Sequence, residues 1–421
     1  MPDEYIFAQM SSEELLLRLV ALVLAALAGG WLLERLHQPS IMGYILAGVV
    51  LGNEFRSFIP SRAFLEHSGD LGLVFMLFFI GTEVDIARLL KDWKIPLLGT
   101  LLGTAVSVAV CLLSGIGLDW TFGQSLFFGF MISLSSTAVV LRILQDFGGA
   151  DSFIGRKSLS ILLLQDLMVI PMLIVMGMFR SEGHVDYSLL ARQVFGGILV
   201  TAVAVFLGSR TKLKIPDWLR LHQNYEFRVL AGLVFSLGAA TITGYLGLSP
   251  ALGAFLSGII FGRMESQLQL HSTLQPFKVL FVAIFFITIG LLVDLDFLWL
   301  HLGRILLLVL MVFLLNTLVT AGVLRFLGVP TIESIVTGCL LAQIGEFAFL
   351  LASSARHYHM IDIDTHKTAV AVIALSLLLT PLWFGIARKL MRFSIGTSAT
   401  RAFDIIPKHG PLTRIHQMHH R

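Results

Sequence analysis

Long apolar segments separated by short polar breaks run through the chain from residue 11 to residue 392. Most are close to the roughly 20 residues that an α-helix needs to cross the hydrocarbon core of a membrane. The pattern predicts an all-α polytopic membrane protein with about thirteen transmembrane helices. The expected spans are 13–35, 40–52, 66–88, 95–116, 122–146, 155–179, 187–209, 224–244, 248–262, 274–294, 301–326, 331–356 and 366–391.

The composition agrees with a membrane setting. Hydrophobic residues fill 56% of the 421 positions, and charged residues only 14%, about half the share usual in soluble proteins. Cys111 and Cys339 both lie inside apolar segments, so neither a disulfide nor a thiol metal site is predicted. The sequence contains no HExxH motif and no nucleophile–base pattern, so we expect no enzyme activity and no cofactor. The net charge of +3 gives no indication of nucleic-acid binding.

Basic residues in the short loops predict the orientation, because cytoplasmic loops carry an excess of Lys and Arg. One set of loops is rich in them, and the opposite set carries far fewer. The rich set contains Arg88, Lys91, Lys94, Arg142, Arg156, Lys157, Arg210, Lys212, Lys214, Arg220, Arg388, Lys389 and Arg392. We therefore expect a multi-pass protein of the cytoplasmic (inner) membrane, with the N-terminus outside and the C-terminus in the cytoplasm.

The sequence matches itself at an offset of about 210 positions. Glycines 43, 48 and 52 meet glycines 253, 258 and 262, and Lys157 and Pro171 meet Lys367 and Pro381. The offset spans an odd number of predicted helices, so the two copies would have opposite orientations in the membrane. Such inverted-topology repeats are typical of secondary transporters that work by alternating access.

Asp166 is the only charged residue between Lys157 and Arg180. At the rise of an α-helix, it lies roughly 14 Å and 21 Å from these flanks, near the middle of the bilayer. An ionised carboxylate there costs several kcal/mol unless a cation, a proton or water compensates it. We interpret Asp166 as a site that binds a proton and a cation in turn. The alternative is a structural ion pair with a basic residue on another helix.

Two predicted helices carry small and polar residues halfway along their length. In 122–146 these are Ser135, Ser136 and Thr137, and in 331–356 they are the run Gln343-Ile344-Gly345-Glu346. Hydroxyl groups can bend a helix and glycine permits local unwinding. We therefore expect both helices to be broken and to cross near Asp166. The alternative is that small residues only allow close helix packing.

Several motifs resemble the cation:proton antiporter-2 family, which includes the Kef-type potassium/proton antiporters. The resemblance implies a sodium/proton antiporter-like fold, a homodimer, and a moving core built from helices at about 95–180 and 301–392. It also assigns Asp166 as the ion-binding aspartate, preceded by Gln165. The motifs are RLHQPSIMGYILAGVVLG (35–52), LGLVFMLFFIGTEVD (71–85), SLSSTAVVLRIL (133–144), LLLQDLMVIP (162–171), GLSPALGAFLSGIIFG (247–262), FFITIGLLVD (285–294) and AQIGEFAFLLASSA (342–355).

The chain departs from this family pattern in two ways. Kef-type proteins continue into a nucleotide-binding domain with a glycine fingerprint. No such fingerprint is found in this sequence, which is given up to Arg421. Many relatives also carry a lysine that faces the aspartate, where this chain has Asn316. The expected organisation is an N-terminal helix (1–38), a first repeat (39–180), linking helices (181–247), a second repeat (248–392) and a basic cytoplasmic tail (393–421).

The function predicted is exchange of a monovalent cation, K⁺ or otherwise Na⁺, for protons by alternating access. The expected partners are these ions and membrane lipid. The predicted binding residues are Asp166, Gln165, Ser135, Ser136 and Thr137. A second group of residues would provide either another proton site or support for the core. This group consists of Glu346, Gln343 and Asn316. Two alternatives stay open, namely a channel-like efflux pathway without proton coupling and a non-transporting scaffold or sensor. The sequence does not exclude a divalent or iron substrate.

Overall fold

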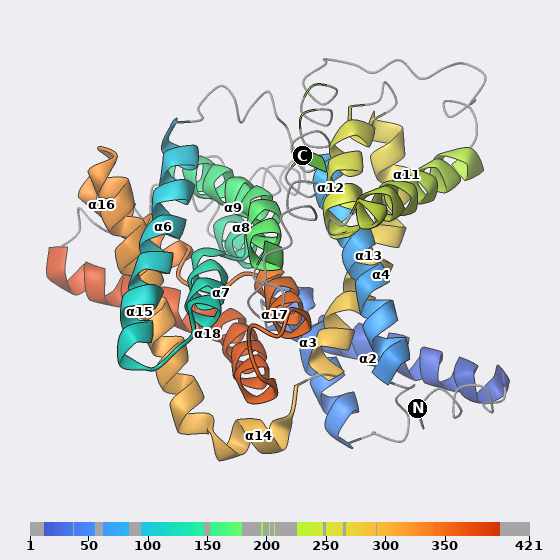
Figure 1. Ribbon diagram of the computed structural model, residues 1–421, viewed down its shortest axis with the longest axis horizontal. Helices are drawn as coiled ribbons and strands as arrows, with labels where there is room; N and C mark the ends of the chain where they lie inside the picture. The colour runs from blue at the N-terminus through green and yellow to red at the C-terminus, as the bar shows by residue number, and fades with distance from the viewer. Residues whose placement is uncertain are drawn as a thin grey trace, which may run out of the picture. The chain divides into compact units, whose positions relative to one another are not determined.

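The computed structural model describes residues 12–36, 38–54, 62–83, 94–146, 152–178, 225–246, 250–263, 267–291 and 293–395, with isolated positions 195, 196, 202 and 206. Every element within these ranges is an α-helix (Figure 1). The helices are α2 (Ser12–Arg35), α3 (Ser40–Glu54), α4 (Arg62–Glu83), α6 (Lys94–Gly117), α7 (Phe122–Ser133), α8 (Thr137–Asp146), α9 (Phe153–Met178), α11 (Tyr225–Tyr245), α12 (Pro250–Phe261), α13 (Gln267–Leu291), α14 (Leu295–Leu300), α15 (Leu302–Phe326), α16 (Thr331–Leu340), α17 (Phe347–His357) and α18 (Ile363–Ile395).

The predicted all-α membrane architecture is confirmed. Seven described segments are long and apolar enough to cross a membrane, and three shorter apolar helices accompany them. The seven are Lys94–Gly117, Phe122–Leu144, Phe153–Met178, Glu226–Tyr245, Leu274–Leu291, Leu302–Phe326 and Ile363–Leu390. The predicted span 187–209 and most of the tail 393–421 lie outside the described residues. The short helix α14 was not predicted, because its six residues are too few to show a period.

The chain divides into two compact units. The first contains Met1–Lys91 and Leu173–Asp296, and the second contains Asp92–Met172 and Phe297–Arg421. Each unit therefore draws one part from each half of the sequence.

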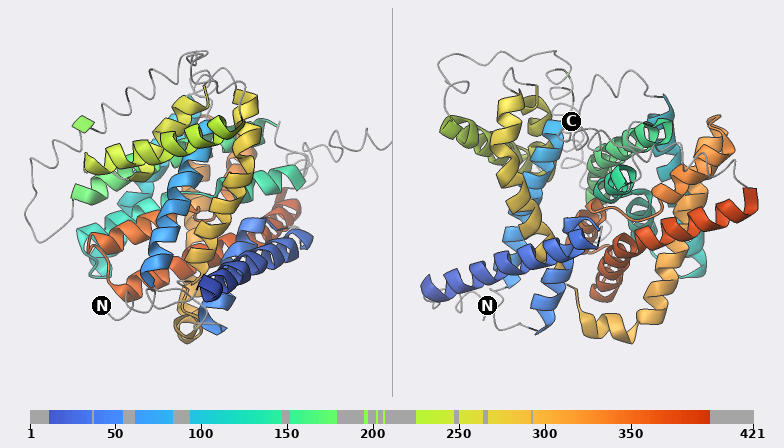
Figure 2. Two further views of the ribbon diagram at one scale, coloured as in Figure 1. Left: turned by 90° about the vertical axis from the view of Figure 1, so that its right-hand side faces the viewer. Right: turned by 180° about the vertical axis from the view of Figure 1, so that it is seen from behind.

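In the first unit, helices from one sequence repeat pack against helices from the other. Helix α3 packs on α13, and α12 packs on α4; Figures 1 and 2 show pale-blue α4 beside yellow α12 in each view. A Cβ on Gly48 would lie 2.9 Å from the Gly290 Cα, and one on Gly258 would lie 3.1 Å from the Gly81 Cα. The sequence offset pairs Gly48 with Gly258 and Gly81 with Gly290 within one residue. The two close backbone contacts are thus copies of one contact.

The same offset relates two further contacts in this unit. Helix α2 meets α3 where the Gly29 backbone faces Gly43, and α11 meets α12 where the Ala239 backbone faces Gly253. An apolar cluster fills the space between α4, α11, α12 and α13, and its members include Phe75, Phe78 and Phe261. The duplication seen in the sequence therefore extends to α2 and α11.

The second unit repeats itself in the same manner. Helix α6 packs on α7, and α15 packs on α16. A Cβ on Gly129 would lie 2.5 Å from the Val108 Cα, and one on Gly338 would lie 2.5 Å from the Thr317 carbonyl oxygen. These positions are related by the offset found in the first unit. The inverted-topology repeat predicted from the sequence is therefore also present in the packing of this unit.

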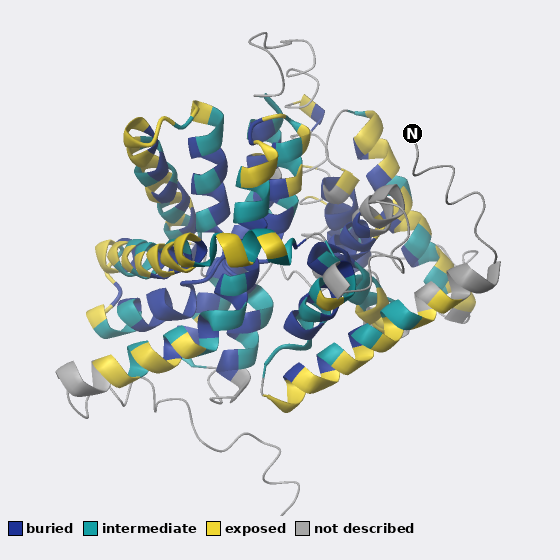
Figure 3. Ribbon diagram, turned by 90° about the horizontal axis from the view of Figure 1, so that it is seen from below, coloured by how far each residue is buried: buried dark blue, intermediate teal, exposed yellow. Residues whose placement is uncertain are grey.

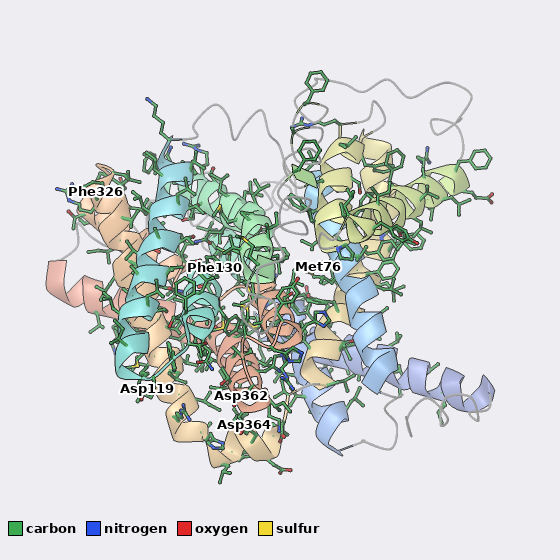
Figure 4. The ribbon with its side chains drawn as sticks, viewed as in Figure 1. Met76, Asp119, Phe130, Phe326, Asp362 and Asp364 are labelled. Atoms are coloured by element: carbon green, nitrogen blue, oxygen red, sulfur yellow. The ribbon has the colours of Figure 1, made fainter. Side chains whose placement is uncertain are left out.

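The outward faces of the helices are apolar, and charges gather at helix ends. Exposed side chains follow one side of the outer helices (Figure 3), and on α15 they include Leu307, Met311 and Leu318. Figure 4 labels Asp119 and Asp362, which lie in turns between helices of the second unit, and Asp364, which lies in the first turn of α18. Such a surface suits a helix bundle surrounded by lipid. Hydrogen bonds from the hydroxyl and the backbone N–H of Thr365 hold the pKa of Asp362 below its usual range.

Candidate functional site

The first broken helix is interrupted after Ser133 and resumes at Thr137. The Ser133 hydroxyl donates to the Phe130 carbonyl at 2.9 Å, and Leu134 adopts extended dihedral angles (φ −94°, ψ 133°). The Ser136 hydroxyl accepts from the Val139 N–H at 3.3 Å and so caps the new helix α8. The polar residues thus provide the hydrogen bonds that end one half-helix and begin the next.

The second broken helix is interrupted between Leu340 and Phe347, and its extended segment crosses the first one. The Gly345 N–H donates to the Leu134 carbonyl at 2.9 Å, and the Ser135 hydroxyl donates to the Leu341 carbonyl at 2.8 Å. A Cβ on Gly345 would lie 2.5 Å from the Ser135 oxygen. The two breaks therefore cross with their backbones in contact, as predicted. We call the two segments between the half-helices, 134–136 and 341–346, the crossover.

Neighbouring helices satisfy one backbone N–H in each extended segment. On α9, Gln165 accepts from the Ser135 N–H through its Oε1 at 3.1 Å. On α18, the Ser376 hydroxyl accepts from the Ile344 N–H at 3.2 Å. By its contacts, Ser376 is therefore the counterpart of Gln165, and Asp166 has no counterpart of the same chemistry in the second half.

Asp166 lies on α9 beside the start of α8. Its side chain is 6% exposed, and its Oδ2 accepts from the Thr137 hydroxyl at 3.0 Å. The N-terminus of α8 adds a partial positive charge, about half an elementary charge for a full helix. Among the described residues, no Lys or Arg acts electrostatically on Asp166, but the Glu346 carboxylate does. Asp166 thus lacks an internal cationic partner in this part of the chain.

Glu346 and Gln343 reach the same place from the second segment. Glu346 is 7% exposed and Gln343 is fully buried. The Ser136 hydroxyl and the Ala138 N–H face the Glu346 carboxylate, and Gln343 Nε2 donates to the Ser136 carbonyl in a long contact of 3.5 Å. The start of α8 is therefore flanked by two carboxylates, one from each half of the sequence.

Asn316 contacts the crossover from the side of α15. Its Nδ2 donates to the Ala342 carbonyl at 3.1 Å, so a neutral amide serves one of the carbonyl groups exposed by the broken helix. A pocket within the second unit, between α6 and α15, reaches this side of the crossover. Its polar lining consists of Ser107, Ser133, Ser135, Gln165, Asn316 and Thr320.

The structure brings all the residues predicted from the sequence to the crossover or directly beside it. Sequence reasoning missed three residues, Ser376, Ser107 and Thr320. The repeat contains a signal for two of them, because the offset of about 210 places Ser376 on α18 opposite Asp166, and Ser107 on α6 within one residue of the position opposite Asn316 on α15. A hydroxyl in an apolar helix is otherwise too common to single out.

Two broken helices that cross beside a buried aspartate, in an inverted-repeat helical protein, define a membrane antiporter fold. Residues 22–387 match the sodium/hydrogen exchanger transmembrane family, and the chain belongs to this family. It is thus a member of a family of membrane exchangers rather than of enzymes.

The fold is similar to that of the sodium proton antiporter MjNhaP1 from Methanocaldococcus jannaschii. The TM-score is 0.65 at 16% identity, over 93% of this chain and 100% of that one. In sequence, the chain is 36% identical to the iron transporter MagA of Paramagnetospirillum magneticum, over 88% of this chain and 85% of that protein. It is 32% identical to K(+) efflux antiporter 6 of Arabidopsis thaliana over 87% of its length, and the match covers 62% of that longer relative.

Proposed function

We propose that the protein exchanges a monovalent cation for protons across a membrane, with Asp166 as the carboxylate that the two ions share. The observation that carries the proposal is the surroundings of Asp166. It is buried at membrane depth, it accepts from the Thr137 hydroxyl, and no described Lys or Arg compensates it. A buried carboxylate of this kind is stable only when a proton or a cation neutralises it.

The cycle follows from this competition. A proton leaves Asp166 when a cation enters, and the cation leaves when a proton returns, so the two never occupy the carboxylate together. Ser136, Thr137 and the carbonyl groups of the crossover supply neutral oxygen atoms beside it. Gln165 contributes by fixing the Ser135 N–H, which holds the first segment in its extended form. In this role Gln165 shapes the site, whether or not it also touches the ion.

Alternating access fits the duplicated architecture. Each half of the sequence supplies one broken helix to the second unit, and the two copies have opposite orientations. Equivalent packing contacts in both units allow two arrangements of similar energy, facing opposite sides of the membrane. We expect the crossover to carry the ion and to be exposed to one side at a time.

We propose K⁺ as the first choice of cation and Na⁺ as the second. K⁺ is supported by the potassium efflux antiporters among the relatives, and Na⁺ by the similarity to MjNhaP1. MagA is named as an iron transporter, and iron is therefore included in the test. We place the protein in a cytoplasmic membrane as a homodimer, with the N-terminus outside. Lys94 at the start of α6 and Arg388 and Lys389 in α18 would lie on the cytoplasmic side.

Purified protein in sealed vesicles with an internal pH indicator tests the proposal. Adding K⁺ or Na⁺ outside vesicles with an acidic interior should raise the internal pH, at a rate that saturates with the cation. Fe²⁺ is added in parallel under reducing conditions. A channel-like pathway would instead carry the cation at a rate set by the membrane potential, without a coupled proton. A scaffold or sensor would give no response beyond that of empty vesicles.

A further inference from the structure

We propose that Glu346 is a direct ligand of the transported cation, and that it allows the site to take a divalent cation in exchange for two protons. The inference rests on the proposed exchange at Asp166 and adds a second class of substrate to it. Divalent here means a hard ion such as Ca²⁺ or Mn²⁺.

Two buried oxygen atoms at the crossover have no hydrogen-bond partner among the described residues, Gln343 Oε1 and Glu346 Oε2. Both belong to side chains held at the start of α8. Gln343 Nε2 donates to the Ser136 carbonyl, and the Ser136 hydroxyl and Ala138 N–H face the Glu346 carboxylate. A buried acceptor without a partner is costly. A cation can be bound by several such oxygen atoms at once. We therefore interpret the two unpartnered oxygen atoms as ligands of a cation.

The charge of the pair decides which ions fit. The Glu346 carboxylate acts electrostatically on Asp166, and within the described part of the chain no Lys or Arg acts on either acid. With both ionised, the site carries a formal charge of −2, of which the α8 N-terminus offsets only about half a charge. Net charge at membrane depth is costly. Three loaded states are neutral: two protons, one proton with one monovalent cation, or one divalent cation.

The exchange balances in each case. When a monovalent cation binds, the proton of Asp166 leaves and Glu346 keeps its own. When a divalent cation binds, both protons leave to the side from which the cation came, so no net charge crosses the membrane in either cycle. The ligands are carboxylate, amide and hydroxyl oxygen atoms, which suit Ca²⁺ and Mn²⁺; Mg²⁺ loses its water less readily. Among the described residues no third His, Cys, Asp or Glu joins the two acids, so amide, hydroxyl and carbonyl oxygen atoms would complete the ligand set.

The test uses the full-length protein in vesicles with an acidic interior and an internal pH indicator. Ca²⁺, Mn²⁺ and K⁺ are added in separate experiments, and choline serves as the inert cation. The wild-type protein should raise the internal pH with Ca²⁺ or Mn²⁺ as well as with K⁺, at rates that do not depend on an imposed membrane potential. In Glu346→Gln, the ratio of the divalent to the monovalent rate should fall at least about tenfold, as expected when a charged ligand is lost.

Glu333→Gln is the matched control, because this acid lies in the first turn of α16, away from the crossover. It should leave both rates at their wild-type values. Should Glu346→Gln prove unstable in detergent, Glu346→Asp keeps the charge but withdraws the oxygen atoms by one methylene. It should then slow divalent exchange more than monovalent exchange.

The possible failures are distinguishable. A wild-type protein that exchanges K⁺ or Na⁺ but ignores Ca²⁺ and Mn²⁺ would overturn the divalent inference and leave the proposed function intact. An unchanged rate ratio in Glu346→Gln would remove Glu346 from the ligands. The absence of any cation response would overturn the exchange mechanism itself, and this inference with it.

Discussion

At the scale of single residues, the hydrogen bond between Thr137 and Asp166 is the contact that most directly affects the carboxylate of the site. The hydroxyl donates to the carboxylate at 3.0 Å, and an ionised carboxylate gains more from a donor than a protonated one does. The pair also joins the two helices, α9 and α8, that meet at the crossover. We therefore expect this single hydroxyl to influence both the affinity for the cation and the position of the carboxylate.

Replacing Thr137 by Val keeps the side-chain volume and removes this donor. We expect the apparent KM for the cation to rise by about tenfold or more, because a hydrogen bond to a charged group contributes about 1.5 kcal/mol or more. The increase should be larger at low pH, where protons compete better for the weakened carboxylate. Initial exchange rates against cation concentration at two pH values measure it.

Thr104→Val is the matched control for this substitution. Thr104 is buried on α6, but its hydroxyl oxygen has no hydrogen-bond partner, so its loss should leave the KM unchanged. Equal KM values for Thr137→Val and the wild type would show that Thr137 only fills space.

The broken helices are the elements that make the site. The crossing requires Gly345, because the backbone of the first segment occupies the place that a side chain would need. Each segment is also held by a side chain from a neighbouring helix, Gln165 in one case and Ser376 in the other. The crossover is therefore a packed structure with fixed hydrogen bonds and not a flexible interruption.

Gly345→Ala should strain this crossing. Its Cβ would lie 2.5 Å from the Ser135 oxygen, so the segments must separate and weaken the hydrogen bond from Gly345 to Leu134. We expect a lower thermal unfolding temperature and slower exchange, at a cost of about 1–3 kcal/mol. Thermal unfolding in detergent and vesicle exchange rates measure the two effects.

Gly385→Ala provides the comparison, because a Cβ at this α18 position meets nothing within 4 Å. It should be neutral or slightly stabilising, since Ala favours a helix over Gly by about 1 kcal/mol. Equal loss of stability in both variants would contradict the role given to the close contact at Gly345.

The sequence predicted the breaks, but not how they are held. Ser135, Ser136 and Gly345 interrupt otherwise apolar segments, and this contrast is visible in a single sequence. The partner of each interrupted backbone is not, because Gln165 and Ser376 come from distant positions and only the fold brings them near. The helix α14 and the packing of α2 against α3 were missed for a similar reason, since they depend on the tertiary contacts of short or small-residue segments.

At the scale of the whole molecule, the two halves of the duplication differ at the residue that we propose to bind the proton. Both halves supply a broken helix and a side chain that caps it, but only the first has an acid after that side chain, at Asp166. The second half contributes Glu346 from its extended segment instead. The family resemblance leads us to expect a lysine where this chain has Asn316, and among the described residues no basic group contacts the crossover that would release a further proton.

We therefore expect the exchange to be electroneutral. One carboxylate that trades one proton for one monovalent cation moves no net charge, and the rate should fall at low pH as protons outcompete the cation. Current recordings on a solid-supported membrane after a sudden increase in K⁺ or Na⁺ measure this directly. A sustained current that reverses with the cation gradient would show net charge movement, and Glu346→Gln would reveal whether Glu346 supplies it.

The most direct test of the account is Asp166→Asn in the vesicle assay with an internal pH indicator. Asn keeps the shape of the side chain and its contact with Thr137, but it cannot bind and release a proton. We predict that cation-driven proton movement is lost, while the purified variant remains folded and unfolds at the same or a higher temperature, because a neutral amide costs less to bury than a charge. Wild-type exchange rates in Asp166→Asn vesicles would contradict the assignment of Asp166 as the shared ion-binding carboxylate.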